Sequence, residues 1–128
     1  MSIDGKNGPA TFEDVVRPLP ASIRDAACAI REAIQASLPD ADERIYGGAK
    51  IGMALYSING ENNVVCGIQP TATSCKVFFH AWESLVGQGF RLEGSGKNAR
   101  HIKLRDASEL QRLDLARMIS MARAATGH

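Results

Sequence analysis

The sequence predicts an α+β domain in which N-terminal and C-terminal helices pack on an antiparallel β-sheet. Apolar residues recur at helical spacing over residues 20–38, and helical spacing returns after residue 106. Between them, residues 45–80 form short apolar or alternating segments separated by glycine and asparagine turns. Because such short turns join neighbouring strands, the strands must run antiparallel.

The composition is that of one globular domain. The chain has 128 residues, of which 45% are hydrophobic and 5% aromatic, so its core must be largely aliphatic. We assign residues 1–10 to a polar leader and residues 11–128 to a single domain. Fifteen Lys and Arg face fourteen Asp and Glu, which excludes a strongly electrostatic binder of nucleic acid or membrane but allows a local cationic patch.

Cysteine usage and hydropathy indicate the compartment. Cys28, Cys66 and Cys75 show no CxxC spacing, which favours a reducing environment over a disulfide framework. The first residues lack the pattern of a signal peptide, and no uncharged apolar run approaches membrane-spanning length. We therefore expect a cytoplasmic protein with neither a nucleic-acid nor a membrane partner.

Two helices are expected before the sheet. Thr11 and Asp14 have the spacing of a capping box that opens a short helix ending before Pro18. A longer amphipathic helix begins near Pro20 and ends at Leu38, where a proline follows. Its apolar stripe consists of Ile23, Ala27, Ile30, Ile34 and Leu38.

The middle of the chain is expected to be β structure. An acidic turn, Asp40–Glu43, precedes it. The segment 51–58 is almost wholly apolar, which predicts a strand covered on both faces. One or two helical turns follow the strands and end at Gly87. The expected strands span residues 45–48, 51–58, 64–68 and 75–80.

A last helix is expected to continue to Ala125. Ser108 with Gln111, or Asp106 with Glu109, supplies its capping box. Its apolar residues cover about half of its circumference, which is wider than one contact surface requires. The helix therefore packs on the sheet and on a second surface, either a neighbouring helix or the partner chain of a homodimer.

The most distinctive stretch is Leu92–Arg105, which reads LEGSGKNARHIKLR. A glycine-rich loop runs into a strand in which Ile102 and Leu104 point to one face. The other face carries His101, Lys103 and Arg105. This pattern predicts a half-buried strand with a cationic outer face.

The glycine-rich loop has two interpretations. It is not a P-loop, because Lys97 is followed by Asn98 rather than Ser or Thr and a strand follows rather than a helix. Its backbone N–H groups can form an anion nest with charge from Lys97 and Arg100, or its glycines can simply permit a tight turn. The candidate anion-binding residues are Gly94, Ser95, Gly96, Lys97, Arg100, His101 and Lys103.

The cationic face also has two interpretations. If the strands 75–80 and 100–105 pair with matching faces, Lys76 and His80 join the row, and Trp82 lies at the sheet edge as a further part of an anion-binding platform. Alternatively, the row is a solvated face whose charges deter edge pairing.

No metal site, cofactor or catalytic group is expected. His80 and His101 fall short of the three or four converging ligands of a usual site. Cys66 and Cys75 lie in expected strands without an activating base in reach. Iron would take oxygen ligands such as the carboxylates of Asp40–Glu43, and the near-neutral chain has no dense acidic ridge.

Residues 20–125 resemble the YdhG-like domain-of-unknown-function family of small bacterial proteins. The features that carry the resemblance are LPDADERIYGG, VVCGIQP, KVFFHAW and LEGSGKNARHIKLR. The resemblance implies terminal helices packed on an antiparallel sheet and, through some members, a frataxin-like iron chaperone. The chain departs from the family at Gly48-Ala49-Lys50, where a common proline is absent, so no ligand role is carried over to that turn.

These observations favour a non-enzymatic binding module for an anionic small molecule or a protein partner. Two alternatives stay open. One is an iron-binding chaperone of the frataxin-like kind. The other is a self-associating module whose C-terminal helix completes the core of a homodimer.

Overall fold

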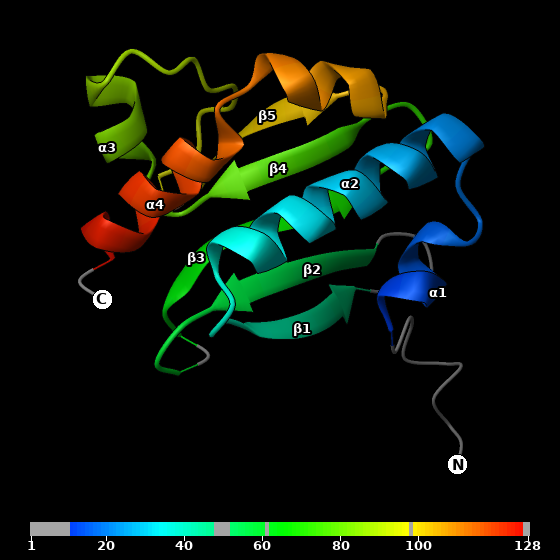
Figure 1. Ribbon diagram of the computed structural model, residues 1–128, viewed down its shortest axis with the longest axis horizontal. Coiled ribbons are helices and arrows are strands. Elements are labelled where there is room, and N and C mark those ends of the chain that lie inside the picture. Colours follow the sequence, from blue (N-terminus) through cyan, green and yellow to red (C-terminus); the bar gives the residue numbers. More distant parts are fainter. Residues whose placement is uncertain (1–10, 48–51, 61, 98, 127–128) are drawn as a thin grey trace.

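The computed structural model confirms the α+β fold class. It describes residues 11–47, 52–60, 62–97 and 99–126, so the leader assigned to residues 1–10 lies outside the described residues. Five strands form one sheet in the order β1-β2-β3-β4-β5, with every neighbouring pair antiparallel. Figure 1 shows α1, α2 and α4 in front of one face of this sheet. Within the described segments, every helix is too short or too polar to cross a membrane.

The elements largely follow the predicted order. In chain order they are α1 (Phe12–Val16), α2 (Ala21–Ser37), β1 (Asp42–Gly47), β2 (Gly52–Ser57), β3 (Val64–Pro70), β4 (Cys75–Phe79), α3 (Trp82–Gly87), β5 (Arg100–Leu104), the 3₁₀ helix η2 (Ala107–Arg112) and α4 (Leu115–Ala125).

A side-chain cap opens the first N-terminal helix, and a proline precedes the second. The backbone N–H of Asp14 donates to Thr11 Oγ1 at 3.2 Å, and the Thr11 N–H donates to Asp14 Oδ2 at 3.2 Å. This reciprocal pair is the predicted capping box of α1. Helix α2 begins directly after Pro20, and its predicted stripe from Ile23 to Leu38 is buried throughout. The helical spacing of these apolar residues therefore places one face of α2 in the core.

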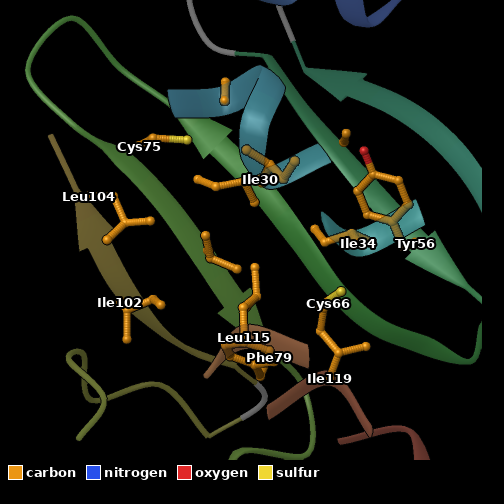
Figure 2. Packing of buried hydrophobic residues seen from close by; sticks show 14 of the residues in the cluster. Ile30, Ile34, Tyr56, Cys66, Cys75, Phe79, Ile102, Leu104, Leu115 and Ile119 are labelled. Atoms are coloured by element: carbon orange, nitrogen blue, oxygen red, sulfur yellow. The ribbon is translucent and has the colours of Figure 1, made fainter. Parts of the chain in front are cut away.

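The core lies between the sheet and the helices. Ile30 and Ile34 of α2 and Ile119 of α4 meet sheet residues such as Tyr56 and Phe79 (Figure 2). The strands alternate as predicted at this face. In β4, the side chains of Cys75, Val77 and Phe79 are buried while those between them are half-buried, and in β5 Ile102 and Leu104 are buried.

Two predictions about the first strands are wrong. Asp42 and Glu43 do not belong to a turn, because β1 begins at Asp42 and pairs from there with β2. Strand β2 is not covered on both faces, because Met53 and Leu55 are only half-buried. The physical reason is that α1 and α2 lie over one face of the sheet (Figure 1). The expected strand ends at residues 48 and 51 lie outside the described residues.

The prediction of one long C-terminal helix is also wrong. Asp106 accepts the N–H of Glu109 and opens η2, a 3₁₀ helix that ends at Arg112. Leu113 is then extended, with φ −106° and ψ 145°. Asp114 accepts the N–H of Arg117 and opens α4 as a separate helix. Each segment has its own aspartate cap, and this divides the chain where periodicity alone suggested continuity.

The wide apolar face of α4 is covered within the chain. Its buried residues are Leu115, Met118, Ile119 and Ala122. Helix α4 contacts α2, α3 and β3, and in Figure 1 it lies between α3 and α2. The second surface is therefore a pair of neighbouring helices, the first of the two alternatives. A homodimer through α4 stays an untested hypothesis.

A polar network anchors α2 to the edge of the sheet. Arg31 Nε and Nη2 donate to Glu43 Oε2 and Oε1 at 2.7 and 2.8 Å. The hydroxyl of Tyr56 donates to Glu43 Oε2 at 2.5 Å, and Phe12 of α1 lies under the Arg31 guanidinium, 4.7 Å from its ring centre. The hydrogen-bonded guanidinium lowers the pKa of the Glu43 carboxyl. One carboxylate thereby ties α2, β1 and β2 together.

We predict that Glu43→Gln removes a stability contribution that depends on pH. The pKa of Glu43 is lower in the folded than in the unfolded chain, so the charged network stabilises the fold above the ordinary carboxyl range, about pH 4.3. That contribution is lost as pH falls through the folded-state pKa. We expect the variant to lose about 1–3 kcal/mol of unfolding free energy at pH 7. The difference in unfolding free energy between wild type and variant, which we call the gap, should narrow below about pH 4.

Urea denaturation at several pH values measures this difference. Glu32→Gln is the matched control, because Glu32 is an exposed carboxylate on α2, next to Arg31 in the chain. A gap between wild type and Glu43→Gln that stays constant down to pH 3 contradicts the prediction.

Candidate functional site

The candidate site lies on the face of the sheet opposite α1 and α2. Strands β4 and β5 pair with Lys76 opposite Lys103 and Phe78 opposite His101. Directly opposed residues of an antiparallel pair share a face, so the matching faces assumed in the platform hypothesis are present. His80 lies one residue beyond β4, with its ring centre 6.1 Å from that of Phe78.

A cavity of about 270 Å³ opens on this face. Its apolar lining comes from Met53 on β2 and Phe78 on β4. The polar lining comes from Gln69, Lys76 and His101, one from each of β3, β4 and β5. Its remaining lining residues are Ala99 and Arg100. A cavity that spans four strands combines an apolar floor with a cationic side.

Gly67 makes room for the aromatic floor. The register places Gly67 beside Phe78 and Leu55 on the same face. A Cβ at Gly67 would lie 2.2 Å from Phe78 Cζ and 2.7 Å from the carbonyl oxygen of Ala54, far inside van der Waals contact. The Phe78 ring therefore lies close over the glycine, which is the close approach that a glycine within a strand permits.

The electrostatics of the face favour an anion. Burial lowers the pKa of His101, and the positive charges of Lys76 and Lys103 lower it further, while Glu93 opposes them. His101 is therefore mainly neutral at pH 7 when no ligand is bound. The two opposed lysines repel each other, and Lys103 leans toward Glu93, with 3.8 Å between Nζ and Oε1. Lys76 is the lysine that lines the cavity.

The glycine-rich loop is held as a turn. Glu93 and His101 exchange both backbone hydrogen bonds, at 2.6 and 3.0 Å, so residues 94–100 connect the two arms of an irregular hairpin. Gly94 has φ 101°, a conformation that favours glycine. These contacts give the loop a structural role, which is the turn interpretation. The anion nest stays a hypothesis, and Lys97 is exposed at its tip.

Trp82 and Arg100 brace this loop. Trp82 Nε1 donates to the carbonyl of Lys97 at 3.0 Å, and Arg100 Nε donates to the carbonyl of Gly96 at 3.4 Å. The Arg100 guanidinium lies 3.6 Å from the centre of the Trp82 ring, which is a cation–π stack. Arg100 pairs with Phe79 in the register, one position before His101, so it alternates with His101 along the strand and lines the cavity only at the start of β5. The sequence interpretation grouped Arg100 with Lys97 as the charges of an anion nest and missed this stack.

Sequence reasoning also missed Ala99 of the cavity lining, and it missed the three strand residues Met53, Gln69 and Phe78. They come together only through the register of β2, β3 and β4, which local patterns do not reveal. One signal was present: Gly67 interrupts an apolar strand, and such a glycine often marks a close approach. Ser95, Lys97 and Lys103 lie outside the set of lining residues.

Two buried cysteines and two of the carboxylates considered above have structural roles. Burial raises the pKa of Cys66 and raises that of Cys75 to about 12, so both stay neutral thiols. Of the carboxylates considered for iron, Asp40 receives two hydrogen bonds from Arg123 and Glu43 is bound by Arg31. Among the described residues, no group of three His, Cys, Asp or Glu side chains is placed to hold a metal ion. The iron alternative stays a hypothesis.

No protein-family model, no curated protein and no solved structure matches this chain. The resemblance to the YdhG-like family therefore rests on the sequence features alone.

We predict that Gly67→Ala displaces the Phe78 ring and destabilises the fold by about 1–3 kcal/mol, because the new methyl group meets both the ring and a fixed backbone oxygen. Thermal denaturation measures the loss, and the NMR shifts of the Phe78 ring report its movement. Gly87→Ala is the matched control, since a Cβ there has nothing within 4 Å. Equal effects of the two substitutions would contradict the close approach at Gly67.

Proposed function

We propose that this chain is a non-enzymatic binding module of the YdhG-like kind, and that the cavity on the outer face of the sheet binds a small organic anion with a flat apolar body. The observation that carries the proposal is the union of an aromatic and thioether floor with a lysine and a histidine in one cavity. The sequence reasoning expected the anion but not the apolar body.

The lining supplies each part of this recognition. The Phe78 ring and the Met53 thioether offer a polarisable surface for a planar ligand. Lys76 supplies a positive charge at the same cavity, and the Gln69 side chain offers an NH₂ group that donates and a carbonyl oxygen that accepts. The volume of about 270 Å³ fits a single ring with one charged group.

The lining favours binding rather than catalysis. The described residues around the cavity include no carboxylate, hydroxyl or thiol, so the usual pairing of a nucleophile with an activating base is not assembled there. The three free cysteines support a reducing compartment, and we place the protein in the cytoplasm within this proposal.

We predict that phenyl phosphate binds this cavity and that Lys76→Ala weakens its binding about tenfold, because one charge-assisted contact is lost. NMR titration of the whole chain measures the affinity and maps the site, with shifts expected at Met53, Phe78 and His101. Inorganic phosphate lacks the ring and benzyl alcohol lacks the charge, so both should bind more weakly.

Arg105→Ala is the matched control for this titration, because Arg105 is an exposed cation next to β5 that does not line the cavity. It should change the affinity less than twofold. No saturable shifts at these residues, or equal losses in Lys76→Ala and Arg105→Ala, would refute the proposed site.

We further predict that binding strengthens as pH falls from 8 to 5.5. Without ligand, burial and the two lysines keep the pKa of His101 below its usual 6.5. A bound anion raises that pKa, so the complex takes up a proton, and affinity rises until pH falls below the pKa of the free protein. Benzenesulfonate is the probe, because its own charge is constant over this range.

His101→Gln should abolish most of this pH dependence. His80→Gln is the control, because burial also lowers the pKa of His80 although it does not line the cavity. If the pH dependence persists in His101→Gln and disappears in His80→Gln, then His80 rather than His101 takes up the proton, and the prediction is wrong.

A further inference from the structure

A second and larger cavity, of about 540 Å³, lies beside α3. Its lining residues are Val86, Phe90, Arg91, Leu92, Glu93 and Arg100. Only Arg100 also lines the cavity on the sheet face. The second cavity is therefore built from a different part of the chain, namely the end of α3 and the segment that leads into the glycine-rich loop.

The apolar part of this cavity is unusual for a surface. Val86 is 45% exposed, although its neighbour Leu85 is fully buried in the core. Phe90 and Leu92 are half-buried and pack against the edge of the same core. The guanidinium of Arg117 lies 5.3 Å from the Phe90 ring centre, which ties this segment to α4. Three apolar side chains thus face one solvent-accessible hollow.

The charged side chains that line this cavity are two arginines and one carboxylate, and the carboxylate is paired with a lysine outside the lining. Arg91 is exposed, and Arg100 is held by its stack on Trp82 and its bond to the carbonyl of Gly96. The one carboxylate in the lining, Glu93, leans toward Lys103. A guanidinium held in advance loses little conformational freedom when it binds an anion, so Arg100 is suited to a planar carboxylate.

We propose that this second cavity binds an alkyl carboxylate, with the chain against Val86, Phe90 and Leu92 and the carboxylate between Arg91 and Arg100. The apolar lining excludes a small hydrophilic anion as the best ligand, and the two arginines exclude an uncharged lipid. The volume of about 540 Å³ lies within the range of small-molecule sites. The occupant is a medium-chain fatty acid or a molecule of the same chemistry.

Trp82 reports on this site. It is the single tryptophan of the chain, and its ring carries the Arg100 guanidinium. A carboxylate that engages Arg100 changes the charge next to the indole, so octanoate should produce a saturable change in tryptophan fluorescence. NMR shifts should map to Val86, Phe90 and Leu92.

Octanol should bind at least tenfold more weakly than octanoate, and acetate should show no saturable binding. Octyl phosphate distinguishes a carboxylate site from a general anion site, and tighter binding of octyl phosphate than of octanoate overturns the carboxylate assignment.

Variants separate this site from the one on the sheet face. Arg91→Ala should weaken octanoate binding about tenfold, and Val86→Asp should abolish it, since it places a like charge in the apolar lining. Both residues are exposed, so the fold should persist, which the amide spectrum verifies. Arg112→Ala, an exposed arginine outside the lining, and Lys76→Ala should leave octanoate binding unchanged.

Three further results would overturn the inference: no saturable response to octanoate, equal affinity for octanol and octanoate, or loss of octanoate binding in Lys76→Ala. The last result would place octanoate in the cavity on the sheet face. Failure of phenyl phosphate to bind would refute the proposed function and leave this second site untouched, because Arg91 and Val86 do not line the first cavity.

Discussion

The arrangement of this protein depends on the burial of one face of its sheet. Helices α2 and α4 cover that face with aliphatic side chains such as Ile30 and Ile119 (Figure 2), and the Glu43 carboxylate fixes α2 at the sheet edge through Arg31 and Tyr56. Because the helices are committed to one side, the alternate residues of the strands meet solvent on the other. The polar and aromatic groups of the candidate site lie on this second face for that reason.

Local patterns were sufficient for the elements and for the faces of the strands. The Thr11 capping box and the alternation around Ile102 follow from spacing alone. Contacts between elements were not predictable in the same way. The stack of Arg100 on Trp82 and the position of Phe78 over Gly67 depend on the register of strands and on loop paths, which a single sequence does not specify. The division between η2 and α4 was missed for another reason: apolar spacing continues across it while the backbone does not.

Arg100 occupies a position between the two cavities. It lines both of them, and its guanidinium is already held by an indole ring and a carbonyl. In the anion hypothesis drawn from the sequence, Arg100 supplied charge to an anion nest formed by the glycine-rich loop. In the structure it is a fixed charge that braces the loop, so the cationic character of this region is built into the packing rather than added by mobile side chains.

The sequential order of the strands has a consequence for how the chain folds. Each strand pairs with the next one along the chain, and such topologies form mainly by closing local loops, which favours rapid folding. The connection between β4 and β5 is the least local of these, because α3 and the glycine-rich loop lie between Phe79 and Arg100. Closing this longest connection carries the largest entropic cost among the hairpins of the sheet. The first three hairpins can therefore assemble early, and the two cavities, which both require the residues around β5, take shape only when the last strand joins.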